Sequence, residues 1–321
     1  MENKLLKFSS SPHVKAPKTT KWIMINVCIS LMPAAASGII FFGLKAFLLI
    51  ALSVLTAFLS ETLYLLIIKK PIKDILKEFD FTSIVTGLLV ALSIGTNYPI
   101  YSVVFGSAFA IIVVKMLFGG TGKNLVNPAV TGRIFIFISF QAMVTPWLIP
   151  MTSTPTTGAT NLELLFGGSS MSILDLFLGT NLGGCIGETC KLAILIGGVY
   201  LAVTKIINII YPLITIAVSG LFAVCLGGFD FSLFLPFILS GGLIFGAIFM
   251  ATDYTTTPNT TLGNIIYFIM LGLLVTGLRF ATKMETISFA ILLMNLLVPL
   301  IDKFIIPKPF GYKKPKKEQL K

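Results

Sequence analysis

The chain contains few charged residues for its length. Lys, Arg, Asp and Glu together make up 12% of its 321 residues, whereas soluble domains carry about 25%. Apolar residues account for 55% of the chain, and the mean hydropathy is +0.95. This composition excludes a soluble globular protein and indicates an integral membrane protein. Because one spanning helix takes about 20 residues, about ten spans fit into the chain.

Histidine and cysteine are also scarce. His13 is the only histidine, and because it precedes the first apolar segment we interpret it as a solvated tail residue. Cys28 and Cys225 lie in apolar runs and are expected to be packing residues. Four residues separate Cys185 from Cys190, whereas metal and iron–sulfur sites use more closely clustered thiolates. We therefore predict no metal site, and a disulfide between these two cysteines stays open if they face outward.

The sequence offers no set of side chains for acid–base or nucleophilic catalysis. We find no nucleophile paired with a base, and no glycine-rich phosphate loop after a strand. The formal net charge is +11, but its lysines stand mostly at helix ends and in the tails, where they orient a membrane protein. We therefore predict no catalytic residue and no nucleic-acid binding. The basic run 313–321 is expected to face anionic membrane lipid.

Ten apolar segments follow one another along the chain, and the third is short for a full span. No short apolar region with a small-residue cleavage site precedes them, so we expect no removable signal peptide. The segments are 22–42, 46–68, 82–94, 100–118, 129–144, 187–204, 207–226, 232–249, 265–279 and 286–304.

Lysine and arginine counts predict the orientation of these segments. If the N-terminus lies in the cytoplasm, only four lysines and arginines fall at the outward-facing ends of the segments: Lys45, Lys191, Arg279 and Lys283. This bias places both termini in the cytoplasm and the long polar loop outside. The expected organisation is an N-terminal tail (1–21), a five-helix half (22–144), an extracytoplasmic loop (145–186), a second five-helix half (187–304) and a basic cytoplasmic tail (305–321).

An odd number of spans in each half inverts the second half relative to the first, as in an inverted repeat. Each half also carries a polar interruption on the inner side, GGTGKNLVNPA at 119–129 and MATDYTTTP at 250–258. Broken, polar backbone at membrane depth is tolerated only where it lines a cavity or a ligand. We find no obvious sequence identity between the halves, so the repeat is a hypothesis.

Asn124 and Asn127 are three residues apart, so on one helical turn they would share a face. An asparagine amide presents both a donor and an acceptor, so the pair could hold the imide edge of a flavin ring or backbone groups. The alternative is helix capping, because Asn127 followed by Pro128 is typical of a helix start. The two interpretations are compatible.

The outer loop contains the tetrapeptide Thr157-Gly158-Ala159-Thr160. Together with three further segments, it resembles the RnfD family of membrane subunits of Rnf ferredoxin:NAD+ oxidoreductase complexes. The chain is similar, more distantly, to the NqrB subunits of sodium-pumping NADH:quinone reductases. The other segments are GGTGKNLVNPAVTGRIF (119–135), GCIGETCKLAILIGG (184–198), and MATD (250–253) with the later Pro258.

The resemblance implies an all-α polytopic fold, like that of urea-transporter-related proteins, with ten helices in two inverted five-helix halves. It implies FMN joined to Thr160 through a phosphoester, attached outside the cytoplasm by a flavin transferase, with Thr157, Gly158 and Ala159 as the rest of the motif. It also implies a second, non-covalent flavin, riboflavin in the related NqrB, near the inner surface. The Asn124/Asn127 segment with Asp253 opposite is the candidate pocket, although Asp253 could instead cap a helix or join a buried ion pair.

The chain departs from the family at one point. Members of the family often carry an acidic residue a few positions before the tetrapeptide, whereas this chain has Thr154, Pro155 and Thr156 there. If the transferase needs that acid, flavin attachment would be slower or absent. Thr156 and Thr157 are weaker candidates than Thr160 for the acceptor.

Acidic residues inside apolar segments are functional candidates by default. Glu61 falls within the second segment and Glu188 opens the sixth, so either could contact a translocated Na+ or H+. The alternative for Glu61 is a side chain near a helix end that reaches the interface or pairs with a lysine. The alternative for Glu188 is a first-turn carboxylate favoured by the helix dipole.

These observations predict a flavoprotein subunit of an Rnf-type complex in the bacterial cytoplasmic membrane. It would carry electrons between ferredoxin and NAD, coupled to Na+ or H+ translocation, and only together with the other Rnf subunits. Two alternatives stay open, a small-solute channel with a urea-transporter-like fold and a scaffold subunit without cofactor. A flavin acceptor in the outer loop distinguishes the first function from both, because fold alone does not fix function.

Overall fold

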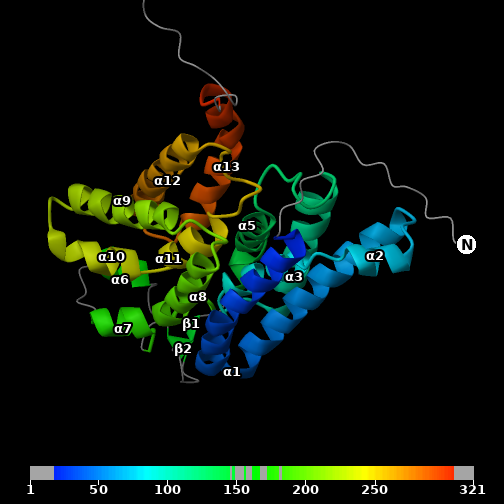
Figure 1. The fold of residues 1–321 in the computed structure, drawn as a ribbon. Helices are drawn as coiled ribbons and strands as arrows, with labels where there is room; N and C mark the ends of the chain where they lie inside the picture. The colour runs from blue at the N-terminus through cyan, green and yellow to red at the C-terminus, as the bar shows by residue number, and fades with distance from the viewer. Residues whose placement is uncertain are drawn as a thin grey trace, which may run out of the picture.

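The protein is a bundle of apolar helices (Figure 1). The computed structural model describes residues 18–144, 147–148, 155–156, 161–166, 172–180 and 183–306. Its α-helices are α1 (Thr20–Ile67), α2 (Ile72–Glu78), α3 (Thr82–Leu92), α4 (Ile100–Phe109), α5 (Pro128–Phe140), α6 (Asn161–Phe166), α7 (Ile173–Leu178), α8 (Lys191–Val203), α9 (Ile210–Leu226), α10 (Phe234–Leu239), α11 (Leu243–Phe245), α12 (Thr261–Thr282) and α13 (Ile287–Phe304). The shorter elements are the π-helices η1 (Ala110–Met116) and η4 (Gly246–Met250), the 3-10 helices η2 (Gln141–Met143) and η3 (Phe231–Leu233), and the strands β1 (Trp147–Leu148) and β2 (Pro155–Thr156).

The described residues confirm an all-α protein, apart from the two-residue antiparallel pair of β1 and β2. By length and composition α1, α12 and α13 could each cross a membrane, and the bent pair Phe231–Leu239 and Leu243–Met250 could form one further span. Five shorter apolar helical stretches complete the bundle, so the count of ten spans stays a prediction. Large apolar side chains such as Leu44 and Val199 are exposed, which agrees with a surface that faces lipid.

Helix α1 is two helices joined at a single residue. Gly43 adopts φ 67° and ψ −151°, a conformation that other residues rarely adopt, and the chain turns back on itself at that point (Figure 1). The two arms correspond to the predicted segments 22–42 and 46–68. The first arm packs on α8 at Gly197, and the second packs on α3 at Gly87, because small residues let helix backbones approach closely.

The bundle has two ends that matter for the sites. The glycine end carries the connection 117–127 between η1 and α5, and the loop end carries residues 144 and 172, which flank the long loop. Helix α5 runs from the first end to the second. Helices α6 and α7 lie at the loop end, whereas α2 and the last turn of α13 lie at the opposite side of the molecule (Figure 1).

Two π-helical turns precede the two polar interruptions. In η1 and its exit, the amides of Leu117 and Gly120 bond to the carbonyls five residues earlier, Ile112 and Lys115. In η4, the amide of Ala251 bonds in the same way to the carbonyl of Gly246. Such wide turns are rare and are frequently found at functional sites, which directs attention to the residues that follow them.

Candidate functional site

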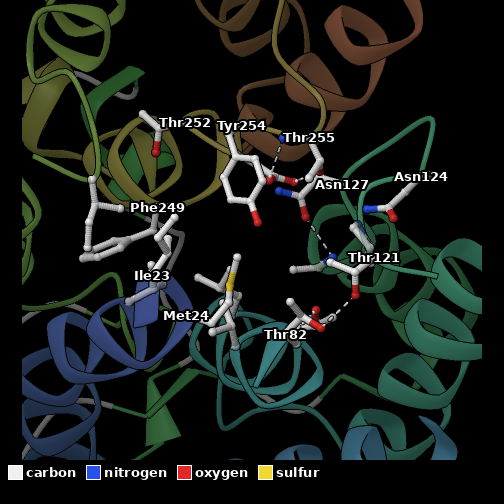
Figure 2. A pocket seen from close by; sticks show the side chains of 18 of the residues that line it. Ile23, Met24, Thr82, Thr121, Asn124, Asn127, Phe249, Thr252, Tyr254 and Thr255 are labelled. Carbon is white, nitrogen blue, oxygen red and sulfur yellow. Dashed lines mark hydrogen bonds between the residues drawn. The ribbon is translucent and has the colours of Figure 1, made fainter. Parts of the chain in front are cut away.

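The two polar interruptions meet in one cavity at the glycine end, which we call the Asn124 cavity (Figure 2). Asn124, Asn127 and Asp253, which were predicted to share a pocket, all line it. The remaining wall is largely apolar and is supplied by α1, α3, α8 and η4. The other lining residues include Ile23, Met24, Val27, Thr82, Val85, Thr86, Leu89, Lys115, Thr121, Leu201, Ile206, Ile248, Phe249, Thr252, Tyr254 and Thr255.

Asn127 caps α5, as its Asn-Pro sequence predicted. Its Oδ1 accepts hydrogen bonds from the amides of Ala129 (2.9 Å) and Val130 (3.4 Å). Its Nδ2 donates to the carbonyl of Met250 at 3.0 Å, which ties the interruption of one half to that of the other. The amide oxygen is therefore used inside the protein, and the cap fixes the shape of the cavity wall.

Asn124 has spare hydrogen-bonding capacity in this cavity. Its Oδ1 is buried and has no hydrogen-bond partner among the described residues, and a buried acceptor without a donor costs about 1–3 kcal/mol. Residues 123–127 are not helical, so the two asparagines do not share a face of one turn. Both asparagines nevertheless line the same cavity, since the non-helical connection that leads to α5 forms part of its wall.

Among the described residues, Asp253 neither caps a helix nor joins an ion pair, the two alternatives to a flavin contact that the sequence left open. It lies between η4 and α12, and its carboxylate accepts bonds from the amide (3.2 Å) and hydroxyl (2.9 Å) of Thr255. Desolvation raises the pKa of Asp253 above its usual range, although the bonds from Thr255 and Thr256 act in the opposite direction. Among the described residues, no salt bridge involves it.

A charged network lies along one side of this cavity, where Lys115 and Thr82 line its wall. Glu61 pairs with Lys115 at 2.6 Å, and both are buried. Lys115 also donates to the hydroxyl of Thr82 at 2.5 Å, and Thr82 donates to Asp80 at 2.5 Å. Burial raises the pKa of Asp80, but the bonds from Thr82 and the charge of Lys115 outweigh this effect and hold it below its usual range. Glu61 therefore pairs with a lysine, which was one of its two predicted interpretations.

A second cavity opens toward the loop end, and we call it the Arg133 cavity. It is built from the exit of α3, the later part of α5, the segment before Glu188, and the start of α13. Its lining includes Ser93, Ile94, Gly95, Tyr98, Arg133, Ile134, Ile136, Phe137, Gln141, Val144, Cys185, Met284, Glu285, Ser288 and Phe289. The sequence reasoning did not single out this cavity, because its members lie in four separate segments.

Glu188 does not occupy the first turn of a helix. Helix α8 begins only at Lys191, and residues 186–189 form turns that enter the bundle. The carboxylate instead pairs with Arg133 at 2.7 Å and is buried. Arg133, which the orientation count placed on the inner side, is thus held in a buried pair inside the bundle and not in a loop. Cys185 and Cys190 are both free thiols.

Three predicted features lie outside the described residues: the tetrapeptide 157–160, His13 and the basic run 313–321. The chain is described again directly after the tetrapeptide, where α6 begins at Asn161. Phe166 of α6 packs edge-on against Phe280 of α12, with ring centroids 5.0 Å apart. Phe280 adjoins Arg279, whose partner Glu285 lines the Arg133 cavity. The segment after the tetrapeptide is therefore anchored on α10 and α12.

Comparison with known proteins gives a consistent assignment. The model of the NQR2, RnfD, RnfE family matches residues 7–311. The chain is 42% identical to the D subunit of the Na(+)-translocating ferredoxin:NAD(+) oxidoreductase complex of Acetobacterium woodii, over 98% of each chain. It is 35% identical to the proton-translocating counterpart of Clostridium ljungdahlii, over 97% of this chain and 98% of that one. It is 34% identical to the D subunit of the ion-translocating oxidoreductase complex of Stutzerimonas stutzeri, over 90% of this chain and 91% of that one. The chain therefore belongs to the NQR2, RnfD, RnfE family.

Proposed function

We propose that this chain is the membrane flavoprotein subunit of an Rnf-type ion-translocating ferredoxin:NAD+ oxidoreductase. The observation that carries the proposal is the similarity to the D subunits of such complexes over nearly the whole chain. The chain would act only within the complex, together with the other Rnf subunits. Its part in catalysis is to hold flavins, set their electrostatic surroundings and exclude competing reactions.

The Asn124 cavity is the proposed site of the non-covalent flavin, riboflavin or a related one. The fit rests on the unpartnered Oδ1 of Asn124, which can accept a hydrogen bond from the imide N–H of such a ring. Phe249 and Tyr254 offer aromatic faces in the same cavity, and the apolar residues of α1 and α3 exclude water from it. A flavin bound there supplies one-electron and two-electron transfer.

The Arg133 cavity is the proposed site for the ring of the covalent flavin, with Thr160 as the phosphoester acceptor. Val144 lines this cavity and is the last described residue before the long loop, and α6 anchors the chain directly after Thr160. The two cavities approach each other along α5. Ala129 lines the first and Arg133 the second, so one helical turn of about 6 Å separates these wall residues.

The remaining assignments follow the same proposal. The protein would lie in the bacterial cytoplasmic membrane with the glycine end inside, because four lysines cluster at the exit of α1. They are Lys69 and Lys70 before α2, and Lys73 and Lys77 within it. A flavin transferase would attach FMN on the other side. Either Na+ or H+ would be translocated, with the buried carboxylates of Glu61 and Glu188 as candidate contacts.

In-gel fluorescence of the denatured protein, co-expressed with a flavin transferase, tests the covalent site. We expect a fluorescent band for the wild type and for Thr156→Ala, which lies outside the tetrapeptide, and none for Thr160→Ala. A fluorescent Thr160→Ala band would refute the acceptor assignment. A dark wild-type band, with the transferase active on another substrate, would favour the channel or scaffold alternative, and solute flux through flavin-free protein would distinguish those two.

The non-covalent site is tested by the flavin that the purified complex releases on denaturation. Asn124→Ala removes the buried acceptor, so we expect about tenfold weaker retention, the equivalent of about 1.4 kcal/mol. Asn259→Ala is the matched control, because Asn259 bonds to Asp302 and does not line the cavity. Equal release from the two variants would count against this site.

A further inference from the structure

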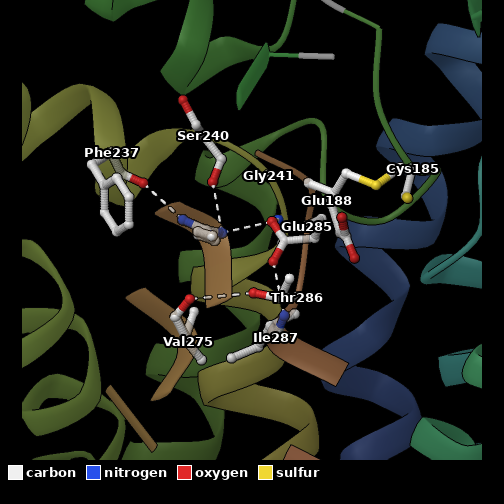
Figure 3. Close-up of polar contacts among 12 residues, drawn as sticks. Cys185, Glu188, Phe237, Ser240, Gly241, Val275, Glu285, Thr286 and Ile287 are labelled. Atoms are coloured by element: carbon white, nitrogen blue, oxygen red, sulfur yellow. Dashed lines mark hydrogen bonds and ion pairs between the residues drawn. The ribbon is translucent and has the colours of Figure 1, made fainter. Parts of the chain in front are cut away.

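Five charged side chains from distant segments come together where α10 breaks into α11. Figure 3 shows two of them, Glu188 and Glu285, beside Gly241. They form two ion pairs, Arg133–Glu188 at 2.7 Å and Arg279–Glu285 at 2.6 Å. The fifth is Lys191, whose Nζ donates to the backbone carbonyls of Glu188 and Gly241. Glu188, Lys191 and Arg279 are each at most 3% exposed. The cluster therefore lies in the interior of the helix bundle.

The two ion pairs differ in how completely they are satisfied. Both oxygens of Glu285 are used, because Oε2 accepts from Arg279 and from the amide of Gly242, and Oε1 accepts from the amide of Ile287. Arg279 in turn holds the carbonyls of Phe237 and Ser240, which end α10. This pair closes the broken span, and of its polar atoms the Nε of Arg279 is left without a partner among the described residues.

Arg133 has donors to spare. A guanidinium carries five N–H donors, yet the described residues offer Arg133 only the Oε1 of Glu188 and the Sγ of Cys185, at 4.0 Å. A thiol is a weak acceptor. Arg133 lines the cavity whereas its partner Glu188 does not. The positive end of this pair therefore faces the cavity.

A second polar group in the same cavity also has hydrogen-bonding capacity to spare. The hydroxyl of Ser288 is buried without any hydrogen-bond partner among the described residues, and Ser288 is 4% exposed. Apolar and aromatic residues also line the cavity, among them Phe137 and Phe289, whose rings pack edge to face at 5.7 Å. The cavity thus combines an apolar lining with two polar groups, Arg133 and Ser288, that have hydrogen-bonding capacity to spare. The carboxylate of Glu285 also lines it, but that carboxylate is paired with Arg279.

We propose that Arg133 is the group of this cavity that stabilises the reduced, negatively charged form of a bound flavin ring. This inference rests on the proposed function. One electron, supplied by a one-electron carrier such as an iron–sulfur protein, adds one negative charge to the ring, and no covalent bond forms or breaks. Because Arg133 balances that charge, the first reduction takes up no proton. Glu188 has the opposite effect, since its carboxylate partly neutralises Arg133.

A redox titration of the covalent flavin in the purified complex tests this role. We expect Arg133→Gln to lower the equilibrium constant for the first electron about tenfold or more, which is a shift of about 59 mV for a one-electron couple. Glu188→Gln, of similar shape, is expected to shift the potential in the opposite direction. The double variant R133Q/E188Q and the charge-conserving Arg133→Lys should both return toward the wild type.

The pH dependence of the same potential separates an electrostatic role from a structural one. The wild-type potential should be independent of pH, whereas that of Arg133→Gln should fall as pH rises, because a proton then replaces the missing charge. Fluorescent covalent flavin in all variants with unchanged potentials would overturn this inference alone. A shift of the potential in the same direction for Arg133→Gln and Glu188→Gln would also overturn this inference and leave the proposed function intact. A wild-type chain without bound flavin would overturn the proposed function as well.

Discussion

The contact between α8 and the first arm of α1 allows a prediction from one added methyl group. A Cβ at Gly197 would overlap the carbonyl oxygen of Ser30 and lie 2.9 Å from the ring of Phe249. Ordinary contacts between heavy atoms are about 3.5–4.0 Å, so the two helices would have to move apart. A backbone oxygen cannot rotate away as a side chain can.

The same methyl group at Gly277 meets nothing within 4 Å. Both glycines lie inside helices, so both substitutions gain the helix propensity of alanine, up to about 1 kcal/mol. Only Gly197→Ala also suffers overpacking, which costs about 1–3 kcal/mol and often more against backbone. We therefore expect the two variants to differ by about 2–3 kcal/mol, with Gly277→Ala the more stable.

Thermal unfolding of the purified variants in detergent, followed by size-exclusion chromatography, measures this difference. Gly197→Ala should unfold below the wild type, and Gly277→Ala at or above it. Phe249 lines the Asn124 cavity, so Gly197→Ala should also release its non-covalent flavin more readily. Equal midpoints for the two alanine variants would refute the close approach of the two helices.

Three further substitutions probe contacts of different strength, each by the same unfolding assay. Lys115→Met leaves Glu61 buried without its partner and should cost about 3–5 kcal/mol, whereas the double variant with Glu61→Gln should recover most of this loss; a double variant no more stable than Lys115→Met would contradict the pairing. Asn127→Ala removes a helix cap and should cost about 1 kcal/mol, and an unchanged midpoint would argue against the cap. Thr215→Val removes the bond from the Thr215 hydroxyl to the carbonyl of Phe268 (2.9 Å) and should cost only about 0.6 kcal/mol, the average for bonds between membrane helices; a loss as large as that of Lys115→Met would refute this ranking.

Much of the Asn124 cavity could be predicted from the sequence because its main signal is local. Polar, glycine-rich and proline-rich stretches between apolar runs stand out in the sequence, and both interruptions indeed line the cavity. The cap by Asn127 is equally local, since it involves only the next three residues. The sequence pattern did not predict the backbone conformation between Asn124 and Asn127, which is irregular and not helical.

The buried charges could not be located from the sequence. The orientation count treats every lysine and arginine as a residue at a membrane surface. Four of them lie instead inside the bundle or at a cavity wall: Lys115, Arg133, Lys191 and Arg279. Glu61 is 54 residues from its partner in the chain, and Glu188 is 55 from its own. Sequence alone contains no signal for such pairings, because they depend on how the helices pack.

The π-helical turns η1 and η4 have a consequence for sequence comparison. A π turn contains one residue more than the α turn it replaces, so it is equivalent to a single-residue insertion inside a helix. Deleting one residue from Ala110–Met116 would let the α-helical ladder continue. The residues after the turn would keep their direction, because the wide turn has absorbed the extra residue, whereas residues inside the turn, Lys115 among them, would point elsewhere. A homologue whose aligned sequence lacks one residue at this point should therefore also lack the acidic partner on α1.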